Sequence, residues 1–213
     1  MPRSALPARL VGGALALYVR LVAATCRVGE GRVTQDQVVL AFWHEYNLVA
    51  AMAAHRLRRH RYHVSFSTQP LRGRVMTALL AGLGAGSVPL PAEDDRRGAA
   101  RLTREMGRLG REGASLAVSP DGPMGPYRRA KPGALIVARA SGLPLQAWAV
   151  SARPSIRLGS RWDRHVVPLP FCRLQVEEAE PIRVAPREPL RPLLAGLQAA
   201  LDEVTARAEA RGG

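Results

Sequence analysis

Short apolar runs separated by segments with helical spacing constrain the fold of this chain more than any other feature. Residues 38–43 are entirely apolar, and the runs at 114–119 and 145–150 are nearly so. Runs of this length without polar alternation are typical of strands covered on both faces, as in parallel sheets. Because the strand-like and helical segments alternate, the sequence predicts an α/β fold with a mainly parallel sheet flanked by helices.

The same alternation gives the expected order of elements. Helices are predicted over about 47–60, 72–83, 97–111, 133–141 and 189–209, and strands over 38–43, 62–67, 87–90, 114–119, 145–150 and, at an edge, 172–176. A chain of 213 residues with 47% hydrophobic content is long enough to bury one substantial core. Residues 29–213 are therefore predicted to form a single domain.

The first 28 residues are set apart as an apolar helix. Residues 10–19 are apolar or glycine, but Arg20 interrupts the run, which is then too short for a clean membrane span of about 20 apolar residues. The sequence predicts a helix lying in a membrane interface, with arginines at the headgroups and large apolar side chains in the acyl boundary. The arginines are Arg3, Arg9, Arg20 and Arg27, and the large apolar side chains are Leu10, Leu15, Leu17, Tyr18 and Leu21. A helix packed on the core, both roles on different faces, and a cleaved signal peptide are the alternatives.

A formal net charge of +14 and a pI near 11.4 predict an anionic partner, such as acidic lipid headgroups, a phosphorylated substrate or nucleic acid. Aromatic residues make up only 5% of the chain and no nucleic-acid recognition module is visible, so nucleic acid is a minor alternative. Cys26 and Cys172 lie far apart without metal-ligand spacing, so neither a disulfide framework nor a metal site is expected. His55, His60 and His63 lie in or near a basic cluster and are expected to face solvent or headgroups.

Two side chains with catalytic chemistry follow directly on predicted buried strands. His44 follows the run 38–43, and Asp121 follows the run 114–119. Reactive groups in such sheets gather beyond the carboxyl ends of the strands. A neutral histidine suits a general base, because its ordinary pKa is about 6.5. For Asp121 the alternative is an ordinary turn in which the carboxylate caps its own backbone.

The loop after Asp121 is basic. Arg128, Arg129 and Lys131 precede the predicted helix 133–141, and cations beside the free N–H groups of a helix start favour an anion such as phosphate. A solvated basic loop is the alternative.

Together these residues resemble a known family. Five short strings carry the resemblance: Phe42-Trp43-His44, Ser119-Pro120-Asp121-Gly122-Pro123-Met124-Gly125-Pro126, Lys131-Pro132-Gly133, Trp162-Asp163-Arg164 and Pro168-Leu169-Pro170-Phe171. In order and spacing they are similar to a bacterial branch of the lysophospholipid acyltransferase-like superfamily over about residues 15–182. The resemblance implies an α/β acyltransferase at the cytoplasmic face of the inner membrane, peripheral or N-terminally anchored. It also implies transfer of a fatty acyl group from acyl-CoA or acyl carrier protein to a hydroxyl of a lysophospholipid or related lipid, with no bound cofactor.

The resemblance also implies roles for residues. His44 takes the place of the catalytic base, and Asp121 that of the acidic residue in a motif associated with acceptor binding. The candidate substrate-binding residues are Glu45, Gly122, Pro123, Arg128, Arg129 and Lys131. The chain departs from the family at two places. The family has a carboxylate five positions after the histidine, where this chain has Val49. The family branch also has an Arg-His-x-Asp-Gly string near residues 67–74, which this chain lacks.

Both departures remove a carboxylate near the expected site. A catalytically impaired lipid-binding relative is therefore an alternative to an active enzyme, and so is a hydrolase that uses the same histidine with water as acceptor. Asp121 is the candidate replacement for the missing carboxylate, supplied from another strand.

Overall fold

The computed structural model describes residues 5–29, 33, 36–57, 63–67, 71–91, 95–122 and 124–212, with the backbone alone for Ala5, His63–Ser67 and Arg96. Among the residues singled out from the sequence, Arg3, His60 and Pro123 lie outside the described residues, as does part of the segment 67–74.

The strands form one mostly parallel sheet. They are β1 (Arg27–Val28), β2 (Val39–Ala41), β3 (His63–Ser67), β4 (Gly86–Pro89), β5 (Ser115–Val118), β6 (Leu145–Arg157) and β7 (Val166–Glu178), in the spatial order β1-β7-β6-β2-β5-β3-β4. The five strands from β6 to β4 are parallel to their neighbours, whereas β7 is antiparallel to β6. The predicted mixed α/β fold with a mainly parallel sheet is therefore confirmed.

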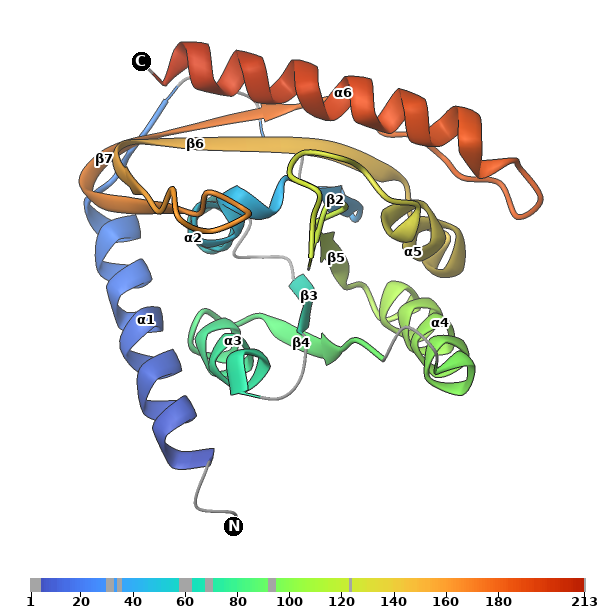
Figure 1. Cartoon of the computed structure of the whole chain (residues 1–213), viewed down its shortest axis with the longest axis horizontal. Coiled ribbons are helices and arrows are strands. Elements are labelled where there is room, and N and C mark those ends of the chain that lie inside the picture. The colour runs from blue at the N-terminus through green and yellow to red at the C-terminus, as the bar shows by residue number, and fades with distance from the viewer. Residues whose placement is uncertain are drawn as a thin grey trace.

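The helices cover both faces of this sheet. They are α1 (Ala5–Thr25), a single 3-10 turn η1 (His44–Tyr46), α2 (Asn47–Leu57), α3 (Leu71–Gly82), α4 (Arg96–Arg111), α5 (Gly133–Ser141) and α6 (Leu190–Arg211). In Figure 1, α2 and α3 lie on one side of the strands with α1 outside them, α4 and α5 lie on the other side, and α6 runs along β6. The helices fall on two faces because the connections between parallel strands are right-handed. The chain crosses the sheet from β2 toward β4 through α2 and α3, and it crosses back from β4 toward β6 through α4 and α5.

The reversal of direction falls between β2 and β5. These strands are neighbours, with Val39 opposite Leu116 and Ala41 opposite Val118. The chain leaves β2 toward β3 but leaves β5 toward β6, so the loops after the two strands diverge. In open α/β sheets, ligands bind in the crevice outside the carboxyl ends of the strands at such a switch point.

Helix α1 has two different faces. Ala16, Val19 and Val22 are buried in the main core, and a Cβ on Gly12 would lie 2.6 Å from the Val75 carbonyl oxygen, so α1 packs tightly on α3. On the opposite face four large side chains are exposed, namely Leu6, Leu10, Leu17 and Leu21. Core packing and an outward apolar face therefore coexist, as one of the alternatives from the sequence anticipated.

The assignment of side chains to the outward face needs correction at two positions. Leu15 and Tyr18 are partly buried against the core, and the Tyr18 hydroxyl donates a hydrogen bond of 2.6 Å to the Pro168 carbonyl. Of the described helices, α1 alone is long and apolar enough by length and composition to cross a membrane, over Leu6–Thr25.

The β6–β7 hairpin is longer than the sequence predicts. Both strands have 13 residues, whereas the apolar runs predict strands over 145–150 and 172–176 alone. The outer part of β6, residues 153–157, is exposed and therefore carries no apolar signature. Strand β7 is also not the edge, because the two-residue β1 pairs with it.

Candidate active site

His44 lies at the switch point, three residues beyond the end of β2. Trp43 is extended and fully packed in the core, and His44 opens the turn η1, so the imidazole projects from the end of a rigid strand. Its side chain is 23% exposed, which leaves one edge of the ring accessible.

Asp121 comes from the loop after β5 and fixes the backbone around His44. Its carboxylate is completely buried and accepts hydrogen bonds from the His44 N–H at 2.9 Å and from the Arg128 N–H at 3.3 Å. Burial raises the pKa of Asp121 to about 6, although these two N–H groups oppose the rise. Asp121 therefore holds His44 by its main chain rather than by its ring.

The carboxylate that faces the ring is Asp163, in the turn of the β6–β7 hairpin. Asp163 Oδ2 lies 3.6 Å from His44 Nε2, and the side chain is completely buried. Arg161 holds it with two hydrogen bonds of 2.9 and 3.0 Å. Burial raises the pKa of Asp163, but Arg161 and the neighbouring His165 and His44 rings outweigh burial and hold the pKa below its ordinary value. Asp163 is therefore a carboxylate at neutral pH.

This arrangement fixes the tautomer of His44. A carboxylate can only accept, so the ring proton is on Nε2 and Nδ1 carries the lone pair. The neighbours of Nδ1 agree, because the Asn47 amide approaches it at 3.0 Å as a donor while Ser119 Oγ donates to the Asn47 carbonyl oxygen at 2.7 Å. The lone pair of the imidazole therefore lies on the side of the β5 loop.

Gly122 leaves room beside that lone pair. A Cβ at this position would lie only 2.7 Å from His44 Nδ1 and 3.3 Å from Cε1. Absence of a side chain therefore lets the β5 loop pass close to the ring without a clash at Nδ1.

Trp162 covers the other surface of the imidazole. The two rings stack with centroids 5.2 Å apart and planes 29° apart. Burial lowers the pKa of His44 to about 4 even though Asp163 raises it, so the imidazole is neutral at neutral pH. A neutral, oriented imidazole is able to accept a proton on Nδ1 from a bound nucleophile that takes the place of the Asn47 amide.

The basic residues of the β5 loop divide into two groups. The Arg128 guanidinium is bound by the buried Glu45 and by Glu209, and Glu45 also binds Arg157. Glu45 and Arg128 therefore neutralise each other instead of facing the crevice together. Arg129 and Lys131 form no ion pair with a described residue, and Arg129 is exposed.

Sequence reasoning placed His44, Asp121 and Gly122 together correctly but assigned no role to Asn47 or Asp163. Val49, where the carboxylate was expected, is buried in the core side of α2. The signal for Asp163 was its place in the Trp-Asp-Arg string, an acidic residue in an otherwise basic stretch.

No family model matches this chain. The chain is similar to an uncharacterized protein of Rickettsia prowazekii (strain Madrid E), with 27% identity over 150 residues. The match covers 70% of this chain and 66% of the Rickettsia protein, so the chain spans about two thirds of the length of this relative. The similarity brings no activity with it, and function has to be argued from the site.

Proposed function

We propose that this protein is a membrane-associated O-acyltransferase that uses His44 as a general base. The observation that carries the proposal is the environment of the imidazole, with the buried Asp163 carboxylate facing Nε2 at 3.6 Å and the Asn47 amide at 3.0 Å from Nδ1. The ordered motifs shared with lysophospholipid acyltransferases support acyl transfer as the reaction.

The proposed step is attack of an acceptor hydroxyl on the carbonyl of an acyl thioester. His44 Nδ1 takes the hydroxyl proton as the oxygen bonds to the carbonyl carbon, and the imidazolium that forms is stabilised by Asp163. When the tetrahedral intermediate collapses, the carbon–sulfur bond breaks and the imidazolium returns its proton to the leaving thiolate. General-base help of this kind is worth roughly 10²–10⁴-fold in rate.

The proposed donor is acyl-CoA or acyl carrier protein, and the proposed acceptor is a lysophospholipid or a related lipid with a free hydroxyl. Arg129 and Lys131 are the cations proposed to hold an acceptor phosphate, because Arg128 is already bound by Glu45 and Glu209. The outward apolar face of α1 supports an acceptor drawn from a membrane.

Asp163 also bears on the rival proposal of an impaired relative. That alternative rested on the two missing carboxylates, at Val49 and near 67–74, and a buried carboxylate from another element now faces the His44 ring. An active enzyme is therefore the stronger proposal.

The test compares the purified protein with His44→Ala and the closer isostere His44→Gln. Lipid vesicles, a long-chain acyl-CoA and a panel of lysophospholipids are supplied, and products are identified by mass spectrometry. We expect acylated lipid from the wild type and at least a hundredfold lower rate from both variants. Acylation by His44→Ala at the wild-type rate would refute the mechanism, and release of free fatty acid alone would indicate a hydrolase.

A further inference from the structure

A second cavity lies between α1 and the C-terminal end of α2, away from the crevice. Its volume is about 300 Å³, and it is lined by Arg20, Ala23 and Ala24 of α1 and by His55 and Arg56 of α2. Because α2 starts beside His44 and rises about 1.5 Å per residue, the cavity is roughly a helix length from the imidazole. The two sites are therefore separate.

The cavity is positively charged and has no counter-ion among the described residues. Neither Arg20 nor Arg56 forms an ion pair with a described carboxylate, and neither α1 nor α2 contains an acidic residue. Two guanidinium groups around one hollow repel each other, and an anion between them would remove that cost. The geometry therefore favours an anionic ligand.

His55 adds a polar group of fixed orientation. Its Nδ1 lies 3.2 Å from the Leu83 carbonyl oxygen, which can only accept, so Nδ1 carries the proton. The other ring nitrogen, Nε2, remains for a ligand. The cavity thus offers two forked cations and one imidazole nitrogen, a set that suits a phosphate with neighbouring hydroxyl groups.

The surroundings of the cavity indicate where that phosphate comes from. Arg20 borders the outward face of α1, on which Leu17 and Leu21 are exposed. At the end of the same helix Phe171 is 75% exposed, adopts a φ of 62°, and donates its N–H to Thr25 Oγ1. A bulky residue held in the left-handed region is costly, and an exposed Phe beside exposed leucines matches the apolar side chains that enter a membrane interface.

We propose that this cavity binds the phosphate of an anionic phospholipid headgroup while the outward face of α1 enters the acyl boundary of the same leaflet. The cavity supplies charge and the leucines supply apolar area, which are the two components of interfacial binding. This inference deepens the membrane association within the proposed function and rests on that part alone, because acyl transfer at His44 is not needed for it.

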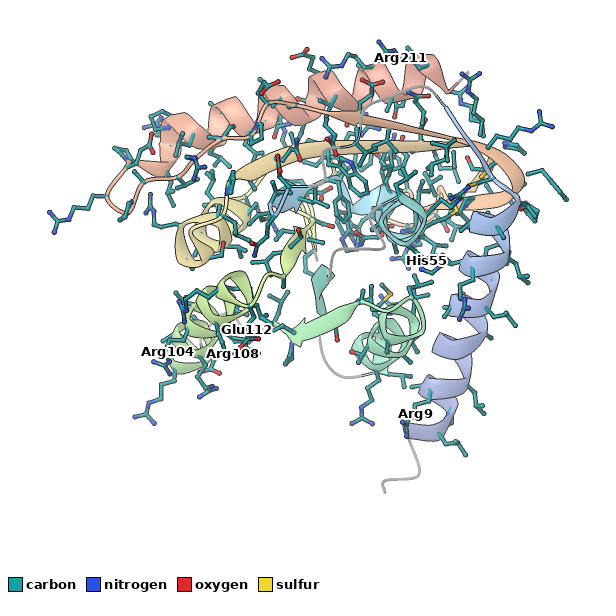
Figure 2. All side chains as sticks on the ribbon, turned by 180° about the vertical axis from the view of Figure 1, so that it is seen from behind. Arg9, His55, Arg104, Arg108, Glu112 and Arg211 are labelled. Carbon is teal, nitrogen blue, oxygen red and sulfur yellow. The ribbon has the colours of Figure 1, made fainter. Side chains whose placement is uncertain are left out.

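The experiment is vesicle flotation with the full chain, using phosphatidylcholine alone and phosphatidylcholine mixed with phosphatidylglycerol. Arg20→Gln combined with Arg56→Gln removes both cations, and Arg104→Gln is the matched control. Figure 2 shows Arg104 on α4, on the opposite side of the molecule from Arg9 of α1 and from His55. The control charge thus lies far from the proposed membrane surface, where screening over about 8 Å leaves it little effect.

We expect the mixed vesicles to bind the wild type more tightly than phosphatidylcholine alone. The double variant should lose roughly 25-fold in affinity for the mixed vesicles, about fivefold for each arginine, while Arg104→Gln changes it less than twofold. His44→Ala should bind as the wild type does, which separates this test from the test of acyl transfer.

Three outcomes would overturn the proposal. The first is equal binding of wild type to both kinds of vesicle, and the second is an equal loss for the double variant and Arg104→Gln. The third is salt-sensitive binding of duplex DNA that is as tight as vesicle binding and depends on the same two arginines, which would make the cavity a nucleic-acid phosphate site.

Discussion

Gly122→Ala is the sharpest perturbation of the candidate base, because it adds one methyl group where the imidazole lone pair lies. The new Cβ would stand 2.7 Å from His44 Nδ1, so the ring would have to retreat by about 0.7 Å to reach the 3.4 Å of ordinary contact. Trp162 stacks on the ring and Asn47 holds Nδ1, which leaves little freedom for that movement. A misplacement approaching 1 Å costs roughly 10²-fold in rate, so kcat is expected to fall by about that factor.

The fold should tolerate the same change. The φ of Gly122 is not in the left-handed region, so alanine meets no backbone strain there, and overpacking against the ring should lower the free energy of unfolding by only about 1–3 kcal/mol. Gly196→Ala in α6 is the matched control, since a Cβ at that position meets nothing within 4 Å. It should stabilise the helix by up to about 1 kcal/mol without affecting kcat.

The assay measures thiol release from acyl-CoA together with the acylated lipid product, and urea unfolding is measured on the same samples. If Gly122→Ala keeps the activity of Gly196→Ala, the lone pair on Nδ1 is not where the acceptor proton goes. A loss of activity accompanied by unfolding would equally contradict the reasoning, because the perturbation would then not be local.

The carboxylates around the site are expected to respond in three different ways. Asp163→Asn keeps the size of the side chain but removes the charge facing His44, so kcat should fall by roughly 10²-fold or more with little change in the KM for the acceptor, as steady-state kinetics would show. Unchanged kcat would exclude Asp163 as the positioning residue. Glu45→Gln removes the buried carboxylate shared by Arg128 and Arg157 and leaves Arg128 with Glu209. It should lower the free energy of unfolding by about 2–3 kcal/mol in urea titrations, whereas a loss below 0.5 kcal/mol would mean that the pairs are solvated. Acidification from pH 6.5 to 4 lowers the stability of the fold through His44, because its pKa in the folded state, about 4, is below its ordinary 6.5. Over the same range Asp121 raises the stability, because its pKa in the folded state, about 6, is above its ordinary 3.8. Asp121→Asn should therefore steepen the acid loss of stability and His44→Gln should flatten it, and slopes that change in the opposite sense would refute these environments.

Local patterns predicted most of the fold. Helix α5 begins at Gly133 and ends at Ser141 as expected, because Gly142 adopts a left-handed φ of 72° and stops the helix. The central strands were predictable because burial on both faces makes them continuously apolar. The outer half of the β6–β7 hairpin was not, since its side chains are exposed and its pairing depends on a partner strand rather than on its own composition.

The candidate site was predictable only where neighbouring strands end at the same edge. His44 and Asp121 meet because β2 and β5 are parallel neighbours, but residue order alone does not distinguish a hydrogen bond to the main chain of His44 from a contact with its ring. Asp163 reaches His44 from a hairpin much later in the chain, through a tertiary contact that no local spacing encodes.

The turn of the β6–β7 hairpin ties the environment of His44 to a segment more than a hundred residues later in the chain. Residues 158–162 of this turn are exposed, so they open at less cost than the core does. When the turn opens, His44 loses both Trp162 and the Asp163 carboxylate, while the sheet beneath it stays packed. An incompletely folded or nicked chain would therefore keep the outward apolar face of α1 but would lose the orientation of the candidate base.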